Sequence, residues 1–219
     1  MPFFNCRAIL FDLDGVLADS TAVVGRQWRI WAVESGVDPD ELLRVAHGRR
    51  TIEVVTMFRP DLTEAAAAAE VRKIEEREAA DIEGVRVIPG AIRFLQSLPR
   101  ERWAVVTSGT RFLATSRLRH CGVPQPAVLV SADEVTNGKP HPEPYLLGAA
   151  GLGVDPTGCL VFEDAPAGIE AAHAAGMKAI AMTTTYPKEK LLAADAHVSS
   201  FENVQVVTAE DGMLRVEML

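Results

Sequence analysis

The sequence has little of what disulfide-stabilised or membrane-spanning proteins require. Its three cysteines, Cys6, Cys121 and Cys159, are scattered through 219 residues without a CxxC spacing. This favours buried free thiols in a reducing compartment over a disulfide framework. No apolar run approaches the length that spans a bilayer, and the N-terminal region has no basic segment followed by a long apolar stretch. We therefore expect a soluble, cytoplasmic protein.

Positive charge is also scarce. The 22 Lys and Arg residues face 30 Asp and Glu residues, which gives a formal net charge of −8. A chain this acidic is not expected to bind nucleic acid or anionic membranes, and an anionic substrate requires a local positive pocket. Hydrophobic residues make up 48% of the chain, which is enough for a substantial core in one large domain or in one domain that carries an insert.

The order of the predicted elements indicates an α/β fold with an insertion. Residues 8–11 form a short apolar run typical of a buried strand, and from about residue 87 strands and helices alternate. Helices are expected at 20–35, 38–47, 50–59, 63–82, 92–98, 111–120, 142–151 and 166–175, and strands at 8–11, 103–107, 127–130, 160–163 and 179–182. The alternation predicts a parallel sheet with helices on both faces. The block at 17–86 has no convincing strand and is expected to be a helical insertion; residues 210–219 predict no element.

Two carboxylates, Asp12 and Asp14, follow the first strand, with Gly15 directly behind them. In an extended chain both point to the same side, and like charges so placed must share a proton or a bound cation. Ligands of open α/β sheets bind beyond the carboxyl ends of the strands, so an active-site edge is expected here. The alternatives are a polar turn and a calcium loop, but Gly15 stands fourth rather than sixth and the flank is strand-like.

Two further strand ends or loops carry polar groups. Thr107, Ser108 and Gly109 follow an apolar strand just ahead of a helix, where hydroxyls and free N–H groups suit phosphate oxygens or a helix N-cap. Lys139 lies in a stiff segment rich in glycine and proline. A lysine in a segment with so little backbone freedom indicates that its charge is needed at a particular place. The alternative is a solvated loop side chain.

The pattern of the first strand recurs at Glu163 and Asp164, which end an apolar run before a helix. Asp164 is also a candidate N-cap of that helix. Carboxylates without soft ligands suit a hard cation, magnesium above all. A magnesium site beside hydroxyl, N–H and ammonium donors suits phosphoryl transfer.

These motifs fall in the order of the four motifs of the haloacid dehalogenase-like hydrolases. The segments are Asp12-Leu13-Asp14-Gly15, Thr107-Ser108-Gly109, Lys139-Pro140 and Glu163-Asp164. The sequence resembles the phosphatase branch, and within it the 2-deoxyglucose-6-phosphate and glycerol-3-phosphate phosphatases. The resemblance implies a Rossmann-like three-layer sandwich with a parallel sheet at 1–16 and 87–219, and an inserted all-helical cap at 17–86.

The resemblance also implies a mechanism. Asp12 is expected to attack the phosphorus and form an aspartyl-phosphate, and Asp14 to act as general acid and then general base. The remaining roles are Mg²⁺ binding by Asp12, Asp14 and Asp164, phosphate binding by Thr107, Ser108, Gly109 and Lys139, and an action of Glu163 through a metal-bound water or on Lys139. The substrate expected is a small sugar or polyol phosphate; no protein partner is evident.

The cap is expected to select the substrate. Gly48 marks a break between helices, so His47, Arg49 and Arg50 are the cap residues expected to face the substrate, with a solvated basic corner as the alternative. A β-phosphoglucomutase is the nearest rival function, but residues 20–24 lack the histidine that follows the first motif in those mutases. A phosphonate hydrolase, whose cap lysine has no counterpart in 42–60, and a non-catalytic phosphate-binding scaffold are weaker alternatives.

Overall fold

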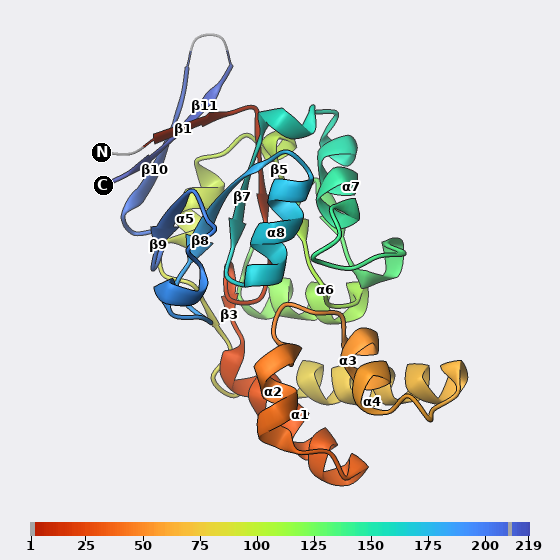
Figure 1. The fold of residues 1–219 in the computed structure, drawn as a ribbon. Coiled ribbons are helices and arrows are strands. Elements are labelled where there is room, and N and C mark those ends of the chain that lie inside the picture. Colours follow the sequence, from red (N-terminus) through yellow and green to blue (C-terminus); the bar gives the residue numbers. More distant parts are fainter. Residues whose placement is uncertain (1–2, 210–211) are drawn as a thin grey trace.

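A computed structural model describes residues 3–209 and 212–219, and its centre is a six-stranded parallel sheet (Figure 1). The strand order is β6-β5-β2-β7-β8-β9, and every neighbouring pair is parallel. The strands are β2 (Ala8–Phe11), β5 (Trp103–Val106), β6 (Val128–Val130), β7 (Cys159–Glu163), β8 (Lys178–Met182) and β9 (Ala196–Val198). The predicted parallel sheet is confirmed, with β9 added at one edge.

Strand β2 is buried on both faces because helices cover both sides of the sheet. Ala8 and Leu10 pack towards α7 (Glu143–Leu152) and α8 (Pro166–Ala174). Ile9 and Phe11 pack on the other side, in the core that includes residues of α5 (Ala91–Gln96) and α6 (Arg111–His120). Continuous apolar runs are typical of strands buried on both faces. Since β2 lies between β5 and β7, the segments that follow these three strands meet at one edge of the sheet.

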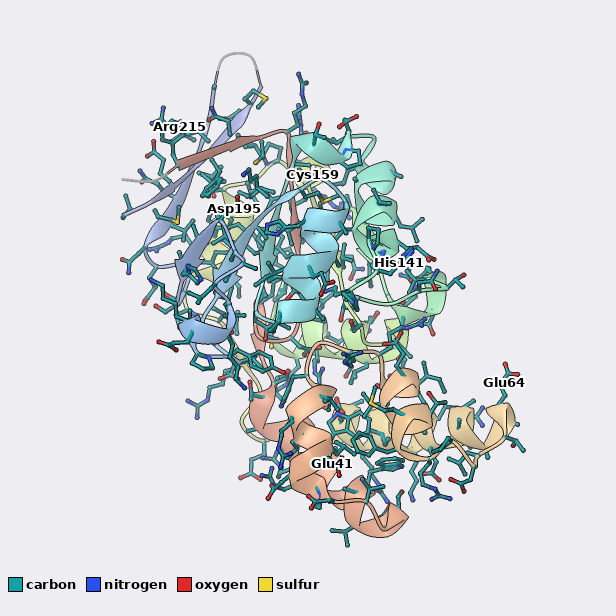
Figure 2. The ribbon with its side chains drawn as sticks, in the orientation of Figure 1. Glu41, Glu64, His141, Cys159, Asp195 and Arg215 are labelled. Carbon is teal, nitrogen blue, oxygen red and sulfur yellow. The ribbon has the colours of Figure 1, made fainter. Side chains whose placement is uncertain are left out.

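Four helices, which we call the cap helices, form a group at the carboxyl edge of the sheet (Figure 1). They are α1 (Thr21–Ser35), α2 (Pro39–Ala46), α3 (Thr51–Phe58) and α4 (Glu64–Ala80), close to the predicted bounds. They have their own core, which includes Trp31, Leu42 and Ile74. Glu41 and Glu64, labelled in Figure 2, are exposed residues of this group and lie away from the sheet.

Two short strands lie where the chain passes between the sheet and the cap helices. β3 (Ala18–Asp19) pairs antiparallel with β4 (Arg86–Val87). The prediction of no strand between 17 and 86 is wrong at this point, because strands of two residues leave no periodic pattern in a sequence. We keep the division into a core of 1–16 and 87–219 and a cap of 17–86 as a proposal, with this pair at the crossing.

A second sheet, which the sequence pattern did not predict, contains β1 (Phe3–Cys6), β10 (Val204–Thr208) and β11 (Leu214–Met218) in the antiparallel order β1-β11-β10. β11 lies in the segment for which no element was predicted, of which residues 210 and 211 are outside the described part. Short 3₁₀ turns occur at Arg100–Arg102, Ala132–Glu134, Pro156–Gly158 and Lys188–Lys190. Within the described ranges, none of the helices has both the length and the apolar character to cross a bilayer.

A cluster of buried phenylalanines on the face of the sheet covered by α5 provides a test of this core. Phe201 is 1% exposed, and its ring lies 5.0 Å from that of Phe94 and 5.1 Å from that of Phe162 between centroids. Phe201→Ala leaves a cavity, so the free energy of unfolding should fall by about 3–5 kcal/mol in urea titrations. The matched control is Phe112→Ala, which removes a ring that is 58% exposed. It should change the free energy of unfolding by less than about 0.5 kcal/mol. Equal effects of the two substitutions contradict this account of the core.

Candidate active site

Three neighbouring strands deliver the predicted residues to one edge. Asp12 follows β2, Thr107 follows β5, and Glu163 ends β7 with Asp164 next in the chain. The sheet pattern continues one residue beyond two of the strands, since the Asp12 N–H donates to the Phe162 carbonyl at 3.0 Å and the Thr107 N–H to Val130 at 2.9 Å. These residues therefore sit on rigid backbone, which suits a site that must hold precise geometry.

Lys139 is at the centre of the site. Its Nζ donates to Asp12 Oδ1 at 2.5 Å, to Glu163 Oε1 at 2.6 Å and to the Val106 carbonyl at 3.1 Å. The side chain is 1% exposed, so the alternative of a solvated loop lysine is wrong. Burial disfavours the charged ammonium, but Asp12 and Glu163 outweigh it and raise the pKa of Lys139 well above its usual value. The buried side chain of Lys139 is therefore favoured in its charged, ammonium form.

Glu163 is held by four donors. Oε1 accepts from Lys139 and, at 3.0 Å, from the Tyr145 hydroxyl, and Oε2 accepts the N–H groups of Asp164 and Ala165 at 2.8 Å each. A Cβ at Gly168 would lie 1.7 Å from Oε1, so glycine is required there for this carboxylate to fit. Of the two roles expected for Glu163, these contacts match an action on Lys139.

The three carboxylates of Asp12, Glu163 and Asp164 gather within 4.8 Å of one another. Burial raises the pKa of Asp12 to about 7 against the opposing charge of Lys139, and burial together with Glu163 and Asp12 raises the pKa of Asp164 well above its usual value. Three carboxylates facing one ammonium leave negative charge that a divalent cation can balance, and oxygen-only ligands suit a hard cation.

Asp164 faces this cluster and does not cap the following helix. Ala165 occupies the N-cap position of α8 and makes no side-chain cap bond. Asp164 instead bonds Thr185. Its carboxylate fits because Gly15 has a φ of +81°, and a Cβ there would lie 2.0 Å from Asp164 Oδ2. The glycine of the first motif is therefore required by both backbone conformation and close approach.

Asp14 lies on the cap side of the site. Its Oδ1 accepts from the Ser20 hydroxyl at 2.7 Å and from Arg117 Nη1 at 2.6 Å, and Arg117 Nη2 donates to Glu78 at 2.6 Å. Sequence reasoning missed Arg117 and Glu78. The available signal was helical periodicity, because Arg117 sits on the buried face of α6 beside Leu113, where a charged residue is unusual.

The segment after β5 is free of helix capping. Thr110 occupies the N-cap of α6 and accepts the Leu113 N–H at 3.4 Å, so neither Thr107 nor Ser108 caps this helix. The Ser108 hydroxyl donates to the Gly48 carbonyl at 2.9 Å, and Thr107 Oγ1 accepts the Gly109 N–H at 3.1 Å. Thr107, Ser108 and Gly109 all line the same cleft as Asp12 and Asp14.

The cap loop contributes His47, Gly48 and Arg49 to this cleft. The His47 ring meets the Tyr186 ring edge-on at 6.4 Å, and burial lowers the pKa of His47 against the charge of Asp14. Arg50, expected to face the substrate, is placed outside the cleft. Its side chain donates to Glu53 at 2.7 Å and to the Val135 carbonyl at 3.1 Å. Arg49 lies in the loop that precedes α3, whereas Arg50 is the N-cap residue of α3, and of these two only Arg49 lines the cleft.

Several known proteins are similar to this chain. A family model described as haloacid dehalogenase-like hydrolase matches residues 6–176. Hexitol phosphatase A of Escherichia coli (strain K12) is 41% identical over 210 residues, covering 95% of this chain and 97% of that protein. Glycerol-1-phosphate phosphohydrolase 2 of Saccharomyces cerevisiae is 38% identical, covering 91% and 84%. A crystal structure of β-phosphoglucomutase from Clostridium difficile has a TM-score of 0.78 at 25% identity, covering 89% and 91%.

Gly15→Ala tests the fit between the first motif and Asp164. The added methyl must displace the Asp164 carboxylate and strain a left-handed backbone, so we expect a loss of about 1–3 kcal/mol in unfolding free energy. Because the displaced carboxylate belongs to the buried acidic cluster, calorimetry with Mg²⁺ as the probe cation should also show binding weakened by roughly tenfold or more. The control, Gly25→Ala, adds a methyl inside α1 with its nearest neighbour at 3.7 Å and should leave Mg²⁺ binding unchanged. Unaltered Mg²⁺ binding in Gly15→Ala contradicts the prediction.

Proposed function

This chain belongs to the haloacid dehalogenase-like hydrolases, and from that premise we propose that it hydrolyses small sugar or polyol phosphate monoesters with Mg²⁺ through an aspartyl-phosphate on Asp12. It is a phosphoric monoester hydrolase of the sugar-phosphatase type. The observation that carries the proposal is the convergence of Asp12, Lys139, Glu163 and Asp164 at the carboxyl edge of one parallel sheet.

Asp12 is the proposed nucleophile. Its Oδ1 is bound by Lys139, so the ammonium orients the carboxylate and leaves Oδ2 to approach phosphorus. As the new bond between Asp12 and phosphorus forms, the bond between phosphorus and the ester oxygen breaks, and Asp14 gives its proton to the departing alkoxide. Asp14 then takes a proton from water, which attacks the aspartyl-phosphate and releases phosphate and free Asp12.

Positive charge near the phosphate is required, because a carboxylate and a phosphate dianion repel each other more strongly as water is excluded. Thr107 and the Ser108 and Gly109 amides are proposed donors to the phosphoryl oxygens. Lys139 would join them by exchanging the Val106 carbonyl for a phosphoryl oxygen, because all three of its N–H groups are bound in this structure. The Gly109 N–H bonds Thr107 Oγ1 in this structure and would exchange that partner for phosphate. Lys139 supplies the fixed cation of the group.

The residues at this edge fit Mg²⁺. We propose that the carboxylates of Asp12 and Asp164 and the main-chain carbonyl of Asp14 hold the ion, because Glu163 already accepts four hydrogen bonds. When bound, Mg²⁺ supplies the positive charge that lets a carboxylate approach a phosphate dianion. Oxygen ligands and an excess of buried negative charge are what a hard divalent cation requires.

The relatives named phosphatase or phosphohydrolase favour hydrolysis over isomerisation. The mutase structure shares the fold at lower identity, and residues 20–24 of this chain contain no histidine. His47 and Arg49 line the cleft from the cap side and are the proposed contacts to the substrate beyond its phosphate. Arg50 is a support of the cap loop in this proposal, since it donates to Glu53 and to the Val135 carbonyl and lies outside the cleft.

Asp12→Asn tests the nucleophile. An amide of nearly the same shape cannot form the aspartyl-phosphate, so phosphate release should fall at least about a thousandfold. Circular dichroism and the melting temperature should remain close to those of the wild type, which separates loss of chemistry from loss of fold. A variant that keeps more than a small fraction of the activity shows that another group is the nucleophile.

A substrate screen with and without Mg²⁺ tests the reaction. Sugar phosphates, polyol phosphates, nucleotides and glucose 1-phosphate are incubated with the protein, and both phosphate release and isomer content are measured. We expect phosphate release from the sugar or polyol phosphates, abolished by a chelator and restored by added Mg²⁺. Isomerisation of glucose 1-phosphate without release supports the mutase instead, and no conversion of any compound supports a non-catalytic scaffold.

A further inference from the structure

We propose that Arg117 is a positioning residue that aligns Asp14 for proton transfer when the cap helices are closed over the sheet. The inference rests on the proposed function, in which Asp14 is the general acid. Arg117 lies on α6, on the sheet side of the cleft, and Glu78 lies on α4 of the cap. Arg117, Glu78 and Asp14 all line the cleft that also contains Asp12.

The guanidinium joins two carboxylates that come from different parts of the fold. Nη1 donates to Asp14 Oδ1 and Nη2 to Glu78 Oε2, each at 2.6 Å. The Arg117 side chain is 6% exposed and that of Glu78 is 4% exposed. A planar guanidinium binds two acceptors in fixed directions, so the position of Glu78 determines the orientation of the Arg117 guanidinium towards Asp14.

The contacts on Asp14 leave one oxygen for proton transfer. Ser20 and Arg117 both donate to Oδ1, at 2.7 and 2.6 Å, and within the described ranges Oδ2 accepts no hydrogen bond. Charge-assisted donors on one oxygen restrict rotation of the carboxylate. Oδ2 is therefore the atom from which the proton reaches the ester oxygen while the bond between phosphorus and that oxygen breaks, leaving the Asp14 carboxylate and an alcohol.

The same interface between α4 and α6 contains a second buried contact. Glu75, one turn before Glu78, accepts from the Thr110 hydroxyl at 2.5 Å and from Thr51 at 3.2 Å. Glu75 and Glu78 thus face α6 together. The Glu75–Thr110 and Glu78–Arg117 contacts both break if α4 moves away from the sheet. In that open state Arg117 has lost the partner that holds it, and Asp14 has lost a fixed donor.

A merely structural ion pair is the alternative, and two observations disfavour it. Arg117 Nε is buried and has no hydrogen-bond partner among the described residues, so the guanidinium is not placed to satisfy its own donors. Buried ion pairs are also weak contributors to stability, because desolvation offsets the attraction between the charges. Arg117 is instead placed to donate to the two carboxylates of Asp14 and Glu78, and Asp14 is the proposed acid.

The test uses the chemistry of the leaving group. An alkoxide needs a proton as it departs, whereas a nitrophenolate or a carboxylate leaves without one, so only the first depends on an aligned general acid. Single-turnover rates with enzyme in excess and saturating Mg²⁺ report this first step alone. The two substrates are glycerol phosphate, and whichever of p-nitrophenyl phosphate and acetyl phosphate the wild type cleaves.

Two variants alter the bridge in different ways. Arg117→Lys keeps the charge but cannot span both carboxylates in the same geometry. The double variant Arg117→Met with Glu78→Gln removes both charges together, which avoids a buried unpaired carboxylate on Glu78 if the single change disturbs folding. The controls are Arg119→Gln and Glu76→Gln, exposed residues of the same two helices.

With glycerol phosphate we expect both bridge variants to lower the maximal single-turnover rate by roughly a hundredfold, the contribution typical of general acid catalysis. The enzyme concentration that gives half of this rate should change less than about threefold. The activated substrate should lose less than about threefold, and the controls should match the wild type on both substrates. Equal losses on the two substrates, or no loss on either, overturn the role of Arg117 while the proposed function stands. A wild type that releases phosphate from none of the sugar and polyol phosphates of the screen overturns the proposed function itself.

Discussion

The buried ammonium of Lys139 is the interaction on which the catalytic edge depends. It binds Asp12 and Glu163 from the neighbouring strands β2 and β7, and Val106 at the end of β5. Removing the ammonium would leave two buried carboxylates without their partner, and a change of this kind costs about 3–5 kcal/mol. Neutralising Asp12 alone leaves Lys139 paired with Glu163. The same ammonium also fixes the direction of the Asp12 carboxylate, so Lys139 contributes both to the stability of this edge and to the orientation of the proposed nucleophile.

The first motif divides two carboxylates between two charged clusters. Asp12 faces Lys139, on the sheet side, and Asp14 faces Arg117, at the boundary with the cap. Leu13 between them is fully buried in the core and anchors the turn. A nucleophile needs a rigid position, whereas a general acid benefits from an environment that changes when substrate is enclosed. The separation of the two clusters matches these different requirements.

Much of the edge could be predicted because each motif is local. Thr107 and Glu163 each stand at or just after the end of a short apolar strand, and parallel strands bring such ends together. The partners of Arg117, and the different directions of Arg49 and Arg50, could not be predicted in this way, although the helical pattern places Arg117 on a buried face. Their directions depend on how helices pack against one another, which a periodic pattern leaves open. The antiparallel sheet was missed because its short, partly exposed strands carry a weak signal.

Residue types, their order and the alternation of strand and helix were enough to predict the parallel sheet and the acids at its edge. The burial of Lys139 between Asp12 and Glu163 follows from the folded arrangement, as does the contact of Arg117 with both Asp14 and Glu78. The difference lies in the distance along the chain over which each effect acts. Propensity and periodicity act over a few neighbouring residues, whereas a buried charge finds its partners among residues far apart in the chain.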